Sequence, residues 1–154
     1  MTYPHSDTDI WGLPDPETQA AFYDSVPTKR LVAFVLDMIA IVILSALIVP
    51  LTAFTGIFFF PFIVTVVSYA YRVVTLANGS ATLGMRLMGI EFRTAKGEMF
   101  DLKYALMHTT LFTIWGVIFI AQVASVVMML TTARKQGLSD LLLGTAAINK
   151  PSRY

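Results

Sequence analysis

Asp37 is the residue whose type and position most strongly suggest chemistry. It is the one carboxylate in the stretch 31–49, which is otherwise apolar except for Ser45. A charged side chain at the centre of a membrane helix costs about 2.5 to 3.5 kcal/mol on insertion scales, so it needs a partner, a proton or water. Asp37 therefore indicates either an ion or proton site or a salt bridge that fixes how the helices pack.

Arg30 is the nearest base, seven positions before Asp37. That spacing is two helical turns and places both side chains on one face. Because helix side chains lean toward the N-terminus, Asp37 leans toward Arg30 while Arg30 leans away, which strains a direct pair. We expect Arg86 or Arg134 to close the gap. Arg86 is interpreted as a counter-ion of Asp37 or Asp140, and its alternative role is to bind a lipid phosphate.

Other kinds of site have few candidate residues. The chain has two histidines, His5 and His108, and no cysteine, so a zinc site or a thiol nucleophile is not expected. We recognise no Ser/His/Asp arrangement, phosphate-binding glycine loop or pair of catalytic carboxylates. We therefore expect no enzyme, no metal and no cofactor. His108 and Gln122 could line a polar path, although such residues more often satisfy groups on neighbouring helices.

The elements that must position these residues are those of an all-α integral membrane protein. Of its 154 residues, 56% are hydrophobic and 14% are charged, with a mean hydropathy of +0.68, whereas soluble domains carry roughly 25% charged residues. We expect spans at about 31–49, 57–74 and 106–130. The first is about 28 Å long as a helix, close to the ~30 Å hydrocarbon thickness of a bilayer. Pro50 ends it, so the first two spans form a helical hairpin.

The third apolar region, 106–130, is uncharged and about 37 Å long if straight. It could be one tilted span, or two half-length helices that turn near Gly116. The turn at 50–56 between the first two spans carries no base. The positive-inside rule therefore favours the returning arrangement, which places all eleven bases on the cytoplasmic side. Both termini and the loop 77–103 are then cytoplasmic.

Three parts of the chain are expected: an N-terminal tail at 1–28, a membrane domain at 29–150 and a short C-terminal tail at 151–154. In the tail, Asp15-Pro16-Glu17 is typical of a helix start, and predicts a short interfacial helix to about Asp24. Within the membrane domain, Thr82 is expected to cap a short helix through Met88. The segments 90–93 and 145–149 are strand-like and could pair at the cytoplasmic face.

Three sequence blocks carry a family resemblance. Arg30 and Asp37 lie in KRLVAFVLD, and the second block, TLGMRLMG, holds Gly84, Arg86 and Gly89. The third block, RKQGLSDLLLGT, holds Arg134, Gly137, Asp140 and Gly144. These blocks, in this order over 27–150, resemble the RDD family, which is named for one arginine and two aspartates. The resemblance places these on Arg30, Asp37 and Asp140.

Two positions depart from the family pattern. Met85 stands where the family often has lysine, and Ser139 stands where it often has histidine or glycine. Phosphate or proton chemistry at those positions is therefore not expected to transfer to this chain.

The resemblance implies a small bacterial inner-membrane protein, and the distribution of bases places its N-terminus in the cytoplasm. Transport is suspected for the family and cation/proton exchange is proposed for some members. We therefore expect proton-linked ion transport through the Arg/Asp cluster. The alternative is a non-catalytic membrane interaction or assembly subunit in which that cluster is structural. Expected partners are the lipid bilayer and a second copy or another membrane protein, and a net charge of +1 gives no reason to expect nucleic acid.

Overall fold

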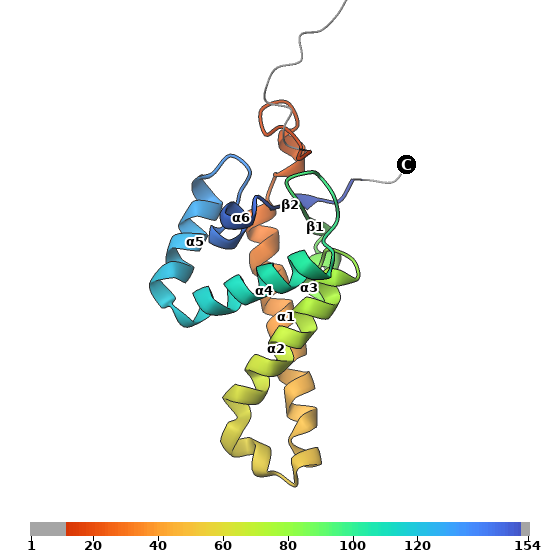
Figure 1. Cartoon of the computed structure of the whole chain (residues 1–154), viewed down its shortest axis with the longest axis vertical. Coiled ribbons are helices and arrows are strands. Elements are labelled where there is room, and N and C mark those ends of the chain that lie inside the picture. The colour runs from red at the N-terminus through yellow and green to blue at the C-terminus, as the bar shows by residue number, and fades with distance from the viewer. Residues whose placement is uncertain (1–11, 152–154) are drawn as a thin grey trace, which may run out of the picture.

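The computed structural model describes residues 12–151 (Figure 1). In chain order its elements are η1 (Ala20–Phe22), α1 (Val26–Ile48), η2 (Pro50–Thr52), η3 (Thr55–Phe59), α2 (Phe60–Ala77), α3 (Leu83–Leu87), β1 (Ile90–Arg93), α4 (Leu102–Val117), α5 (Phe119–Thr131), α6 (Leu138–Leu143) and β2 (Ala146–Asn149).

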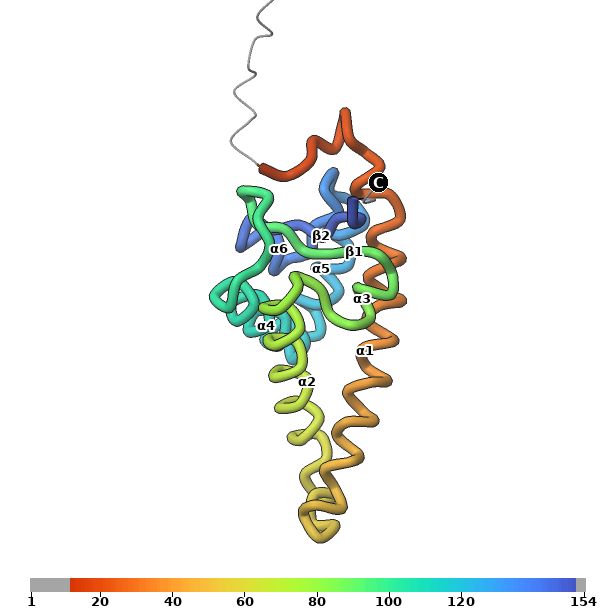
Figure 2. Tube along the Cα trace, turned by 90° about the vertical axis from the view of Figure 1, so that its right-hand side faces the viewer, coloured from red at the N-terminus to blue at the C-terminus, as the bar shows by residue number. Residues whose placement is uncertain are grey.

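α1 and α2 form a long helical hairpin, whose turn lies at the end of the molecule opposite the two strands (Figure 2). Two helical stretches, Ala20–Thr52 and Thr55–Ala77, are long and apolar enough to cross a membrane, and up to three if α4 and α5 together count as one span. Large apolar side chains on the hairpin remain exposed, among them Leu47 and Phe62. An exposed apolar surface of this extent requires lipid or a protein partner to cover it.

The third apolar region forms two helices rather than one. α4 and α5 meet at a bend of 118°, so α5 runs back toward the end of the molecule that carries α3, α6 and the two strands, which we call the sheet end (Figure 1). Extended backbone at Ile118, φ −95° and ψ 91°, separates the two helices. Of the two arrangements left open by its length, the structure has the turning one, and the break lies two residues beyond Gly116.

The sheet end contains the predicted strand pair. β1 and β2 are antiparallel, with Ile90 opposite Asn149 and Phe92 opposite Ala147. Phe92 is buried and belongs to a hydrophobic cluster that also includes Val26 at the start of α1. The strands therefore pack against the hairpin helices and fix the loop between α2 and α4 relative to them.

The N-terminal segment is less helical than predicted. Instead of a helix from Asp15 to about Asp24, the structure has a single turn at Asp15, whose carboxylate accepts the Glu17 backbone N–H and whose carbonyl accepts that of Gln19, followed by the 3₁₀ turn η1. Tyr23 is buried beside Ile148 of β2. This segment therefore covers the sheet. The rest of the expected N-terminal tail, 1–11, and residues 152–154 lie outside the described residues.

Candidate functional site

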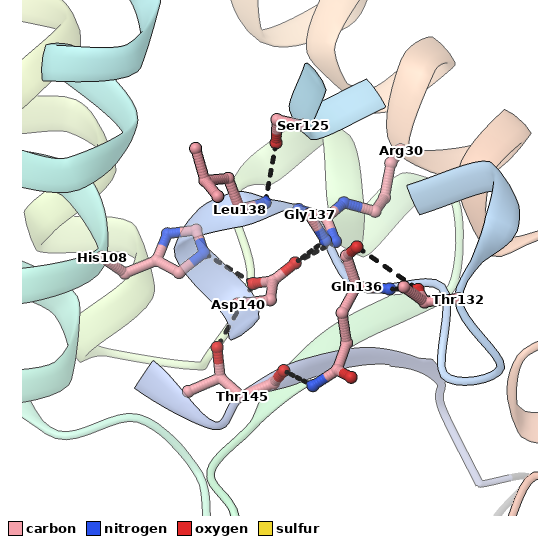
Figure 3. Close-up of polar contacts among 9 residues, drawn as sticks. All are labelled: Arg30, His108, Ser125, Thr132, Gln136, Gly137, Leu138, Asp140 and Thr145. Atoms are coloured by element: carbon pink, nitrogen blue, oxygen red, sulfur yellow. Dashed lines mark hydrogen bonds and ion pairs between the residues drawn. The ribbon is translucent and has the colours of Figure 1, made fainter. Parts of the chain in front are cut away.

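Asp140 lies at the centre of the most completely hydrogen-bonded site at the sheet end (Figure 3). It is in the first turn of α6, and its Oδ2 accepts the backbone N–H of Gly137 at 3.0 Å. The same oxygen accepts a hydrogen bond from Arg30 Nη1 of α1 at 2.6 Å. Oδ1 contacts His108 Nε2 of α4 at 2.9 Å and accepts the Thr145 hydroxyl at 3.2 Å.

These contacts leave Asp140 little capacity for a further ligand. A carboxylate has about four lone-pair positions, and four protein groups surround this one, which is 0% exposed. Burial alone would raise the pKa of Asp140, but the charge of Arg30 and the hydrogen bond from His108 outweigh it and hold the pKa below its usual range. Asp140 thus joins α1, α4, α6 and the start of β2 through one ionised group.

A second layer of hydrogen bonds supports this arrangement (Figure 3). Gln136 Nε2 donates to the Thr145 carbonyl at 2.7 Å. The Ser125 hydroxyl of α5 accepts the backbone N–H of Leu138 at 2.9 Å. α5, α6 and the approach to β2 are therefore tied together around Asp140.

Asp37 forms a separate site, on the same helix as Arg30. Its Oδ1 accepts the Tyr71 hydroxyl of α2 at 2.6 Å and the Gly84 backbone N–H at 2.8 Å. Its Oδ2 accepts the Thr82 hydroxyl at 2.6 Å. Thr82 is the N-cap residue of α3, so the Asp37 carboxylate lies at the N-terminus of that short helix, where a negative charge is favourable.

The two hydroxyl groups at this site have a fixed hydrogen-bonding direction. Tyr71 Oη accepts the backbone N–H of Leu83 at 3.1 Å, and Thr82 Oγ1 accepts that of Met85 at 3.2 Å. Each hydroxyl therefore donates its own proton to Asp37. Three consecutive N–H groups at the start of α3 reach the carboxylate, one directly and two through a hydroxyl, which satisfies groups that a helix start otherwise leaves unpaired.

The prediction that Asp37 pairs with an arginine was wrong. Among residues 12–151, no lysine, arginine or histidine nitrogen lies within ion-pair distance of its carboxylate, and Arg30 pairs with Asp140 instead. The structure therefore separates the two aspartates into two sites that share only α1.

The glycines of the three sequence blocks allow these close approaches. A Cβ at Gly84 would overlap the α1 backbone carbonyl of Ala33 and lie 2.9 Å from Asp37 Oδ1, so only glycine lets α3 approach α1 this closely. A Cβ at Gly137 would lie 2.8 Å from the Ser125 hydroxyl. Gly89 and Gly144 adopt positive φ, 68° and 66°, where L side chains are strained.

Comparison with known proteins agrees with the sequence blocks. The family model described as RDD family matches residues 25–144. The chain belongs to the RDD family. No curated protein and no solved structure matches the chain. The match contains Arg30, Asp37 and Asp140, the three residues whose contacts are given above.

The other two arginines predicted for the RDD cluster do not reach its acids. Arg86 donates to the carbonyl oxygens of Ala81 at 3.2 Å and Thr75 at 3.3 Å. It binds the end of α2 to the loop before α3, so the prediction of a counter-ion was wrong. Arg134 interacts with the Tyr23 hydroxyl near the N-terminal segment.

Some residues of the RDD sites were missed in the sequence. Tyr71 has no sequence signal beyond its place near the end of an apolar run. For His108, the structure has the alternative to a polar path, a bond to a group on a neighbouring helix, although the sequence did not identify Asp140 as that group. Arg72, which was only counted among the bases, is buried in α2, and its guanidinium carbon lies 3.8 Å from the centroid of the Phe112 ring. The one available signal was Thr82, a cap residue followed closely by a glycine.

Proposed function

We propose that this RDD protein is a non-enzymatic, multi-pass protein of the bacterial inner membrane that acts by interacting with other membrane components. In this proposal the Arg/Asp cluster is structural. The observation that supports it is that Asp140 is completely buried and surrounded by four protein groups, while Asp37 caps a helix. A carboxylate with this many donors offers an ion few free positions.

Proton-linked ion transport is the second candidate. It is favoured by the position of Asp37 on the wall of a cavity that Gln122 also lines. The Oδ2 atom of Asp37 accepts one hydrogen bond from the described residues, so it retains a lone pair for a cation. For this reason Asp37, and not Asp140, is the group that a transport mechanism would use.

Ion flux in proteoliposomes tests the choice between the two functions. Wild-type protein should give no Na⁺, K⁺ or H⁺ flux above protein-free vesicles, and Asp37→Asn should change only the amount of folded protein. Flux that is clear for wild type and absent for a folded Asp37→Asn protein would replace the structural function with transport.

Interaction with another membrane protein, or with a second copy, needs its own measurement. The exposed apolar face of the hairpin is the candidate surface, and Phe62, which is 68% exposed, is a suitable position for a photo-crosslinking residue. Irradiation of intact cells should give a product of discrete mass. If photo-crosslinking residues placed at several positions on this face gave crosslinks to lipid and none to protein, the assembly function would be contradicted.

The proposal also includes an orientation, with both termini and the sheet end in the cytoplasm. The return of α5 supports it, because Ala133 and Lys135 then lie beside Tyr23 and Asp24 at the start of α1, so the basic segments gather at one end. The chain has no cysteine, so single cysteines report position directly. A cysteine at Thr55 in the hairpin turn should react with an impermeant maleimide in intact cells, whereas cysteines at Glu98 and Ala133 should not.

A further inference from the structure

A cavity of about 500 Å³ lies between α1 and α5, with α2, α3, α4 and β1 also contributing to its wall. This volume is within the range of sites that bind small molecules. Most of its lining is apolar, and Leu31, Phe34, Val126 and Leu130 on its walls are between 41% and 62% exposed. The cavity is therefore bordered by apolar surface of the kind that faces lipid.

Arg72 is the charged group in this cavity whose bonding capacity is unused. Its side chain is 7% exposed and lines the cavity. Within 12–151 its guanidinium has no hydrogen-bond acceptor, and Nε is fully buried without a partner. Its described contact is with the Phe112 ring, a cation–π arrangement at 3.8 Å. An arginine has five N–H donors, and a buried charge without partners is costly.

Neither of the two family aspartates pairs with Arg72. Asp37 also lines the cavity, but it accepts Tyr71, Thr82 and Gly84, and is not within ion-pair distance of Arg72. Asp140 is paired with Arg30. The protein thus supplies Arg72 with an aromatic face on one side and no described acceptor for its donors.

We propose that this cavity binds an anionic phospholipid, with the phosphate on Arg72 and an acyl chain along the apolar walls. A guanidinium is planar and can donate two parallel hydrogen bonds to phosphate oxygens. Arg72 lies five residues before the end of α2 at the sheet end, about 7.5 Å along the helix axis. That depth suits the headgroup of a lipid in the cytoplasmic leaflet, where basic pockets between helices bind such headgroups.

The apolar walls distinguish a lipid from a soluble anion. An inorganic phosphate would use Arg72 alone and leave Leu31, Phe34, Val126 and Leu130 uncovered. A lipid covers both parts of the cavity at once. This inference goes beyond the proposed function, and flux measurements do not decide it.

Native mass spectrometry of the full chain in neutral detergent measures the binding directly. Phosphatidylglycerol should bind, and phosphatidylcholine of the same chain length should bind at least about tenfold more weakly, because its headgroup carries no net negative charge. Arg72→Gln should reduce phosphatidylglycerol binding to the phosphatidylcholine level. Lys103→Gln is the matched control, since Lys103 is exposed, lies outside the cavity and carries the same charge.

Thermal unfolding separates loss of binding from loss of folding. Without anionic lipid, Arg72→Gln should unfold at the same temperature as wild type or higher, because it removes a buried charge without an acceptor. Phosphatidylglycerol should raise the unfolding temperature of wild type and of Lys103→Gln, but not that of Arg72→Gln. Val126→Trp, which fills the cavity without changing Arg72, should also abolish the rise.

Four results would overturn the proposal. Two concern the choice of lipid: the two phospholipids bind equally, or palmitate binds through Arg72 while phosphatidylglycerol does not bind. The third is that inorganic phosphate binds with the affinity of the lipid. The fourth is that Arg72→Gln is markedly less stable than wild type in neutral detergent, which would make Arg72 a structural partner of Asp37. Each can occur whether or not the protein transports ions, so failure here is distinguishable from failure of the proposed function.

Discussion

Removing one member of the Arg30–Asp140 pair should destabilise the protein far more than removing both charges together. Arg30→Gln leaves the Asp140 carboxylate, 0% exposed, without the guanidinium that contacts it at 2.6 Å. Asp140→Asn leaves the Arg30 charge, on a side chain that is 15% exposed, without an acid. The double variant Arg30→Gln/Asp140→Asn leaves neither charge uncompensated.

The contacts of Asp140 set the expected size of the effect. Breaking a buried ion pair from one side costs about 3 to 5 kcal/mol. Each Asp140 oxygen has two of these contacts, so the amide NH₂ of Asn, whichever oxygen it replaced, would face two of the four groups, and Asp140→Asn should lie at the upper end of that range. For a chain of this length, 1 kcal/mol corresponds to a shift of roughly 2 to 4 °C in the unfolding temperature. Each single variant should therefore lose roughly 6 to 20 °C, with Asp140→Asn in the upper part of that range, and the double variant clearly less than the sum of the two.

The unfolding temperatures of purified wild type, the two single variants and the double variant should be measured in the same detergent. Lys103→Gln is the control for the loss of a base. Losses of less than about 2 °C for both single variants would show that the pair contributes no more than a surface salt bridge does. Strict additivity in the double variant would show that the two side chains do not interact energetically. Either result would refute the structural function of the cluster.

Three further predictions follow from the same contacts. Gly84→Ala should destabilise strongly because its Cβ would overlap the α1 backbone, whereas Gly116→Ala, with no atom near the added Cβ, should be neutral in the same unfolding assay. The low pKa of Asp140 stabilises the fold above about pH 4 and loses this effect as the pH falls further, so between about pH 6 and pH 3 wild type should lose more stability than Asp140→Asn. Hydrogen exchange should become faster in α3 for Asp37→Asn and in α6 for Asp140→Asn; faster exchange across the whole chain in both would contradict two separate sites.

The parts of the fold that depend on local pattern were predictable. The apolar runs at 31–49 and 57–74 predicted the hairpin, and the alternation at 90–93 predicted the strand that pairs with β2. The bend between α4 and α5 was left open because Ile118, where the helix breaks, is flanked by apolar residues and carries no helix-breaking signal. Beyond the bend α5 packs against α6, a tertiary contact that a sequence pattern does not contain.

The partner of Asp37 was mispredicted for an electrostatic reason. A buried carboxylate needs compensation, and reasoning from side-chain charge alone leads to arginine. In the structure, the N–H groups of α3 and two hydroxyls supply that compensation. Thr82 followed by Gly84 was the available signal, because a cap residue and a glycine that allows close approach together indicate a helix start that can receive a carboxylate.

The seven-residue spacing of Arg30 and Asp37 takes on a different meaning once both sites are known. Two helical turns keep the side chains on one face of α1 but about 10 Å apart along its axis, too far for one ion to contact both. Each side chain therefore reaches a different segment that arrives later in the chain. Arg30 pairs with Asp140 of α6, which in turn contacts α4 and the start of β2. Asp37 accepts hydrogen bonds from α2 and from the start of α3. One arginine and two aspartates thereby attach these later segments to α1 at two independent points, and neither aspartate pairs with Arg72.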